Sequence, residues 1–159
     1  MFKKIAMAAP LTVLMFGSIA VQAKDDASST INITADIPTK QFHAQPRDPN
    51  FGKDETMSFN TVTGELSTLR ATYDLKNTDG SIEAYLDGDV ALYSGSSSIP
   101  LTISLNGVTL GTTPVEVAAD APSTPGMQAD LVITAAKPAD GQSGLFTAKP
   151  VVMFDAVPR

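Results

Sequence analysis

The chain has 159 residues and carries 11 Lys and Arg against 17 Asp and Glu, a formal net charge of −6. It contains no Cys and one His, which excludes disulfides, thiolate nucleophiles, Cys-based zinc sites and a multi-histidine metal site within one chain. The acidic balance argues against nucleic acid as a partner, and a hydrophobic content of 43% predicts a folded domain.

The N-terminal 23 residues have the features of a secretory signal peptide. A basic head over residues 1–4 precedes an uncharged stretch over residues 5–21, and small residues follow at an A-x-A-like cleavage site. We therefore expect cleavage between Ala23 and Lys24. The alternative is a transmembrane anchor, for which the stretch is marginal because Pro and Gly interrupt it. Removing this segment takes away two Lys, so the mature chain keeps 9 basic and 17 acidic residues, a net charge of −8.

The first strong pattern in the mature chain is an alternation of apolar and polar residues. One face of the predicted strand carries Ile31, Ile33, Ala35 and Ile37, while short polar residues take the other face. Pro38 ends the pattern. By itself this pattern is also typical of the first strand of an ordinary β-sandwich.

Short alternating segments separated by turns fill the rest of the chain. Residues 42–52 are rich in Pro and are predicted to form an irregular crossing, and residues 94–98 a polar loop. Asn106-Gly107 between two alternating runs predicts a hairpin, because both residues tolerate the positive φ of a type I′ turn. The predicted strands cover residues 57–61, 69–75, 82–86, 99–105, 108–110, 115–117, 131–135 and 145–157.

This succession of short strands predicts an all-β sandwich, since no stretch longer than a turn or two has helical spacing. The last strand contains a proline, Pro150, which has no backbone N–H for the ladder. We therefore expect this part of the strand to lie at an edge or a bulge.

Four segments together carry a resemblance to a known family. They are Asn32-Ile33-Thr34-Ala35-Asp36-Ile37-Pro38, the block 99–113 around Asn106-Gly107, Asp130-Leu131-Val132-Ile133-Thr134-Ala135-Ala136, and the ending 144–154. In order and spacing they resemble the major subunits of CFA/I and CS1 type fimbriae, the class 5 pilins of alternate chaperone–usher systems.

The resemblance implies an immunoglobulin-like sandwich that lacks its final strand. A donor strand from the neighbouring subunit completes such a sandwich, which is a form of β-augmentation. The implied division is a signal peptide over 1–23, an extension with the donor strand over 24–38 and an incomplete domain over 39–159. The donor contacts would be Ile31, Ile33, Ala35 and Ile37. The strand that flanks the acceptor groove would carry Phe146, Ala148, Val152 and Phe154.

The function implied is that of a structural pilus subunit without catalytic activity, which polymerises head to tail into a surface fibre that supports adhesion. Its partners would be copies of itself, a periplasmic chaperone, an outer-membrane usher and a tip adhesin, in a Gram-negative bacterium that exports it through the periplasm. We expect no cofactor, no metal, no nucleic acid and no membrane span in the mature chain.

Two other functions compete with this prediction. One is a minor or tip subunit that binds a host glycan or protein, for which the mature chain offers little room for a second domain. The other is a secreted β-sandwich hydrolase. The sequence does not support hydrolase catalysis, because the single histidine, His43, lies among Pro and Gly without a nucleophile motif nearby. We therefore predict that His43 is a solvated loop residue.

Overall fold

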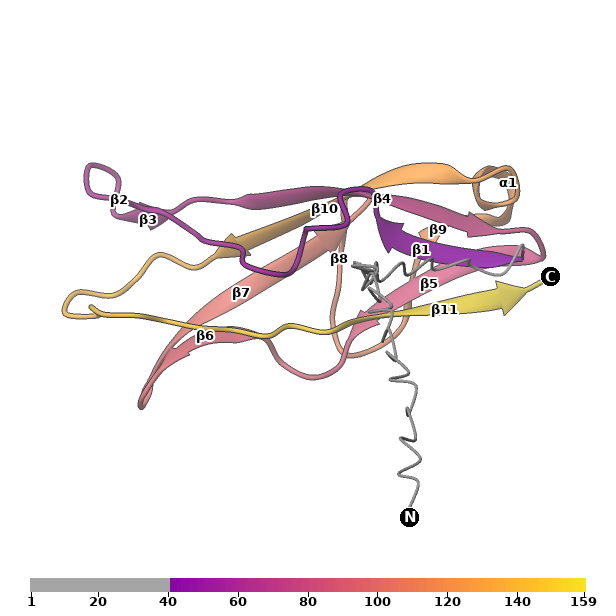
Figure 1. The fold of residues 1–159 in the computed structure, drawn as a ribbon. Helices are drawn as coiled ribbons and strands as arrows, with labels where there is room; N and C mark the ends of the chain where they lie inside the picture. Colours follow the sequence, from indigo (N-terminus) through magenta and orange to yellow (C-terminus); the bar gives the residue numbers. More distant parts are fainter. Residues whose placement is uncertain (1–40) are drawn as a thin grey trace, which may run out of the picture. The chain divides into compact units, whose positions relative to one another are not determined.

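The computed structural model describes residues 41–159, and this part of the chain is almost entirely β-structure (Figure 1). Its helix, α1, is a single turn over Asp120–Ser123. The strands are β1 (Phe42–Pro46), β2 (Phe59–Asn60), β3 (Glu65–Leu66), β4 (Leu69–Asn77), β5 (Gly80–Leu86), β6 (Ala91–Ser94), β7 (Ser97–Leu105), β8 (Val108–Thr109), β9 (Val115–Ala118), β10 (Met127–Ala135) and β11 (Val152–Pro158).

Two antiparallel sheets form the layers of a sandwich. The larger sheet has the strand order β1-β4-β10-β7-β6, with β8 paired to β7, and the smaller has the order β11-β5-β9. The short strands β2 and β3 pair with each other as a separate hairpin. The described domain is therefore an all-β sandwich, as predicted.

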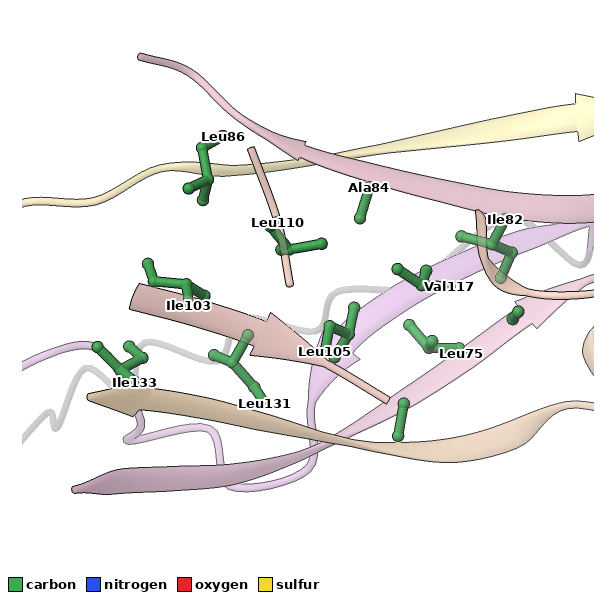
Figure 2. Close-up of a cluster of buried hydrophobic side chains, with 12 residues drawn as sticks. Leu75, Ile82, Ala84, Leu86, Ile103, Leu105, Leu110, Val117, Leu131 and Ile133 are labelled. Carbon is green, nitrogen blue, oxygen red and sulfur yellow. The ribbon is translucent and has the colours of Figure 1, made fainter. Parts of the chain in front are cut away.

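The core lies between the two sheets and follows from the alternation in the sequence. In β5, every second residue is buried, so that Ile82 and Ala84 are both 0% exposed. Figure 2 shows the β5 side chains facing Leu105 of β7 and Leu131 of β10 across the sandwich. Each buried Leu or Ile contributes roughly 1.5–3 kcal/mol to folding.

The predicted hairpin turn at Asn106-Gly107 is confirmed. The φ angles of Asn106 and Gly107 are 52° and 78°, as a type I′ turn between β7 and β8 requires. The side-chain amide of Asn106 also donates a hydrogen bond of 2.8 Å to the carbonyl of Val117, which ties the turn to β9.

The predictions for residues 42–52 and 94–98 are wrong in part. Residues 42–46 form β1 instead of an irregular crossing, and Pro46 is tolerated there for a geometric reason. The N–H of Arg47 bonds to the carbonyl of Thr72, and the N–H of Thr78 bonds to the carbonyl of Gln41. The N–H and C=O groups of odd-numbered residues in this segment therefore face β4, so the nitrogen of Pro46 faces away from β4 and no ladder bond is lost. Similarly, the expected polar loop is reduced to the tight turn of a β6–β7 hairpin.

The prediction of a solvated loop for His43 is also wrong. His43 lies in β1 and is half-buried, and its Nδ1 atom is buried without a hydrogen-bond partner. The strand explains the difference, because β1 lies beside β4 over its whole length.

The last strand is shorter than predicted. Regular pairing with β5 covers Val152–Pro158. The residues before it make an isolated bridge between Thr147 and Tyr93, with hydrogen bonds of 2.8 and 3.0 Å, and the carbonyl of Val151 accepts one bond from Asp87. Pro150 lies between the bridge and β11. Here the segment changes its neighbouring strand from β6 to β5. The N–H that Pro150 lacks would point away from both strands, because the odd-numbered residues make the bonds to them.

The C-terminal end of β11 is held against the β4–β5 turn and α1. The guanidinium of Arg159 makes hydrogen bonds of 2.6 and 2.9 Å to the carboxylate of Asp120, and its N–H bonds to Asp79. The Arg159 guanidinium holds the pKa of Asp120 below its usual range, so this ion pair weakens only when the pH falls through that lowered pKa.

We predict that Gly80→Ala destabilises the domain by about 2–4 kcal/mol. Gly80 has a φ of 154°, and a Cβ there would overlap the carbonyl oxygen of Val157 in β11. Gly95→Ala is the control, since Gly95 has a φ of 59° but open space around it, and should cost only about 1–2 kcal/mol. Urea unfolding of the two variants measures the difference, and equal losses would contradict the role of Gly80.

Candidate functional site

A long apolar groove of about 1150 Å³ opens between the two sheets. Its floor is formed by inward-pointing side chains of the larger sheet. One wall is the segment that follows β1, and the other is the segment that leads into β11. The floor residues are Leu69, Leu101, Ile103, Leu131 and Ile133, and the walls lie within residues 51–59 and 142–152.

The groove exists because the two sheets differ in extent. Register pairs place Leu69 beside Ile133, and Ile133 beside Ile103, toward the end of the sheet where β4 begins. In the other half of the sandwich, β5 and β9 cover the larger sheet, and Leu75 and Ile82 are almost completely buried. Among the described residues, the smaller sheet therefore covers only part of the larger one, and the groove lies over the rest, where Leu69 and Leu101 are half-buried and Ile103 is 1% exposed.

The wall before β11 presents alternating side chains. Phe146, Ala148, Pro150 and Val152 are half-buried and line the groove, whereas the residues between them are exposed. Three of the residues predicted to flank a groove, Phe146, Ala148 and Val152, thus lie along this wall. The fourth, Phe154, lies just beyond the groove lining and stacks on Tyr73.

The same wall has an unpaired backbone edge. The backbone of this wall bonds to its neighbours at odd-numbered positions: Thr147 to Tyr93 of β6, Val151 to Asp87, and Arg159 to Asp79. The N–H and C=O groups of odd-numbered residues therefore face the neighbouring strands. Because bonded positions alternate in an antiparallel ladder, the N–H and C=O groups of even-numbered residues point the other way. No strand among residues 41–159 pairs with that edge. The groove thus offers apolar pockets together with a row of backbone donors and acceptors, the two requirements for binding an extended strand.

Three aromatic rings mark the end of the groove next to the filled core. Tyr73 of β4 stacks on Phe154 of β11 with ring centroids 5.7 Å apart, and meets Phe51 edge-on at 6.4 Å. Burial raises the pKa of the Tyr73 hydroxyl above its ordinary value. The cluster joins both sheets and the opposite wall, so the groove is closed here and open toward the β2–β3 hairpin.

The remaining predicted sites lie outside the described residues. These are the donor positions Ile31, Ile33, Ala35 and Ile37 and the cleavage site at Ala23 and Lys24. Within residues 41–159, no group of three His, Cys, Asp or Glu side chains is arranged to hold a metal ion. The described part of the chain contains no helix with the length and apolarity needed to cross a membrane.

Sequence reasoning missed the floor and the wall over residues 51–59. The floor residues alternate like any core residues, so nothing in the pattern separates a covered position from an uncovered one. A signal for the wall was present in Phe51, Met57 and Phe59, which are large apolar residues in a segment with little regular structure.

Comparisons with known proteins agree with this architecture. A family model described as CS1 type fimbrial major subunit matches residues 27–155. Among solved structures, the chain is similar to the CooA pilin subunit from enterotoxigenic Escherichia coli, with a TM-score of 0.52 and 12% identity over 75% of this chain and 99% of that chain. At this identity the likeness shows the fold. No curated protein sequence matches the chain significantly.

We predict that Tyr73 makes the domain less stable at high pH. The folded state holds the Tyr73 proton more tightly than the unfolded state does, so stability falls as the pH rises above about 10. Tyr73→Phe should unfold within about 1 kcal/mol of the unmodified protein at pH 7 and lose less stability between pH 8 and 11. Urea unfolding across this range tests the prediction, and parallel pH profiles would contradict it.

Proposed function

The chain belongs to the CS1 type fimbrial major subunit family, and on that premise we propose that its groove accepts the N-terminal extension of a neighbouring copy as a donor strand. Members of this family are structural subunits that build surface fibres, and they are not enzymes. The observation that carries the proposal is the coincidence of an apolar groove with the unpaired backbone edge of residues 146–154.

The extension has the right side chains for such a groove. Ile31, Ile33, Ala35 and Ile37 alternate with short polar residues, so one face of an extended strand would enter the groove. Burial of the three Ile side chains contributes about 5–9 kcal/mol before the cost of ordering the strand. A slip by one residue would place Asn32, Thr34 and Asp36 in the groove instead, so the alternation also sets the register.

The lengths agree as well. Residues 29–37 extend over about 30 Å as a strand. The groove wall over residues 144–152 contains the same number of residues. Pro150 leaves one gap in the row of backbone donors, so the donor strand would be bonded mainly on either side of that position.

The direction of insertion follows from where the extension leaves the domain. The N–H of Thr78 bonds to the carbonyl of Gln41, so the extension starts at the β4–β5 turn, while the groove opens at the opposite end. Two copies that exchanged strands at the same end would close into a dimer, whereas insertion at the opposite end propagates a fibre. Ile37 would then lie at the open end, Ile31 near Tyr73, and the donor would run antiparallel to β11.

The route to the fibre would need further partners. An unfilled groove with an unpaired edge invites aggregation. We therefore include in the proposal a periplasmic chaperone that lends a strand and an outer-membrane usher that exchanges it for the next extension. The fibre would carry a tip adhesin on the surface of a Gram-negative cell.

We predict that Ile33→Asp abolishes fibre assembly and that Thr34→Asp does not. Both variants add the same charge to the extension, but only residue 33 would enter the apolar groove, where an unpaired carboxylate is strongly unfavourable. Electron microscopy and sedimentation of surface extracts measure the fibres. Equal effects of the two variants would refute the proposed register.

A complementary variant places the donor within one chain. Residues 24–37 are deleted, and a copy of residues 29–38 is added after Arg159 through a short turn, which suits an antiparallel donor. We expect a stable monomer that does not polymerise, with a higher melting temperature than the deletion alone. A deletion variant that is equally stable and monomeric without a chaperone would show that the groove needs no donor.

We also predict that the exported subunit begins at Lys24. Signal peptidase should cleave after Ala23, which mass spectrometry of the N-terminal peptide from purified fibres will detect. Replacing Ala23 with Arg should block cleavage and leave the precursor at the inner membrane. Fibre subunits that retain residues before Lys24 would contradict this boundary.

A further inference from the structure

The β2–β3 hairpin displays apolar side chains that its own domain does not use. Val62 at its tip is 92% exposed, and Phe59 is 54% exposed. The conformation of the tip is stabilised by the side chain of Asn60, which accepts hydrogen bonds of 2.9 and 3.2 Å from the N–H groups of Val62 and Thr63. Turn positions usually carry Gly, Asn, Asp or Ser, so a β-branched apolar residue held outward here indicates a contact.

This hairpin forms one side of the open end of the groove. Phe59 and Leu66 line the groove, and the side chain of Lys137 lies near Gly64, where an added Cβ would come within 3.1 Å of its Cε atom. A donor strand inserted as proposed above would therefore pass beside the hairpin at the point where Ile37 leaves the groove.

The opposite end of the domain presents a second apolar surface. Around α1, Ala121, Pro122 and Pro125 are exposed. The segment is fixed by the buried hydroxyl of Ser123, which donates to the carbonyl of Gly80. Figure 1 shows α1 and the β2–β3 hairpin at opposite ends of the described domain. Between them runs β4, whose nine residues extend over about 26–30 Å.

The short linker brings these two ends together in successive copies. Four residues, 38–41, separate Ile37 from the first residue of β1, Phe42. From Ile37 to Phe42 the chain spans at most about 17 Å. Because Gln41 is bonded to Thr78 at the β4–β5 turn, this turn of the donating copy must lie within that distance of the groove opening in the accepting copy.

We propose that a second copy of this chain covers the hairpin tip: Val62 of the accepting copy contacts α1 of the donating copy at Ala121 and Pro122. This contact rests on the proposed donor-strand function and adds an end-to-end interface to it. The hairpin tip of the accepting copy and α1 of the donating copy are the apolar surfaces that flank the short gap spanned by residues 38–41. Their contact limits bending between successive subunits.

The absence of Cys from the sequence makes the contact testable by disulfide cross-linking. The variant Val62→Cys with Pro122→Cys is assembled into fibres and oxidised. We expect a ladder of covalent oligomers on a non-reducing gel after the fibres are dissociated. The matched control, Thr109→Cys with Pro122→Cys, uses an exposed residue on β8 and should give no ladder.

The outcomes separate the two proposals. Fibres that depend on Ile33 but give no ladder through residues 62 and 122 would overturn the end-to-end contact and leave the donor strand intact. Fibres that form equally well with Ile33→Asp would overturn the donor strand, and with it this contact.

A second measurement avoids oxidation. Val62→Asp should leave the melting temperature of the self-complemented monomer unchanged, because Val62 is 92% exposed in the single domain, and should shorten sheared fibres about twofold. Val62→Ile is the control and should preserve their length. Fibres of Val62→Asp that match the unmodified fibres in length after shearing would also overturn the contact.

Discussion

Within residues 41–159, the smaller sheet leaves part of the larger sheet without a covering strand, and this is the constraint from which the other features of the domain follow. Of the Leu and Ile side chains in the groove floor, Leu69 and Leu101 are half-buried, whereas the other three are at most 8% exposed. Every 100 Å² of apolar surface left in water costs about 2.5 kcal/mol. The filled half, with Leu75, Ile82 and Leu105 nearly inaccessible, supplies the core on which the domain folds. In the proposed function, assembly would add a strand over the part of the larger sheet that the smaller sheet does not cover.

Two features control the boundary and the edge of the open half. The Tyr73–Phe154 stack ties the sheets together where the filled core ends, so the groove has a fixed inner limit. Pro150 removes one N–H from the edge that faces the groove, which weakens pairing with any strand that depends on backbone bonds alone. A donor with apolar side chains at the right spacing is affected less, because side-chain burial supplies much of its binding energy. In the proposed function, the proline would therefore favour a specific donor over indiscriminate pairing between edges.

The sequence pattern predicted the elements whose formation depends on local chemistry. Alternation identified the strands around Leu75, Ile82 and Leu131, and Asn106-Gly107 identified a hairpin turn. The pattern could not identify β1, since the tolerance of Pro46 depends on which edge its nitrogen faces. Nor could it distinguish the groove floor from ordinary core, because Ala129 and Ile133 alternate in the same strand although only Ile133 lines the groove. Information of that kind belongs to the pairing of distant strands and to the unequal extent of the two sheets.

The donor strand and the end-to-end contact would act together even if the second is weak. Full burial of one Val side chain contributes only about 1.5 kcal/mol, far too little to hold two free subunits together. The inserted strand changes this, because it ties the two ends through a linker of four residues and gives them an effective concentration in the millimolar range or higher. Under that condition a small apolar contact is populated for much of the time. It therefore sets the angle and stiffness between neighbours, while the strand in the groove supplies the strength of the fibre.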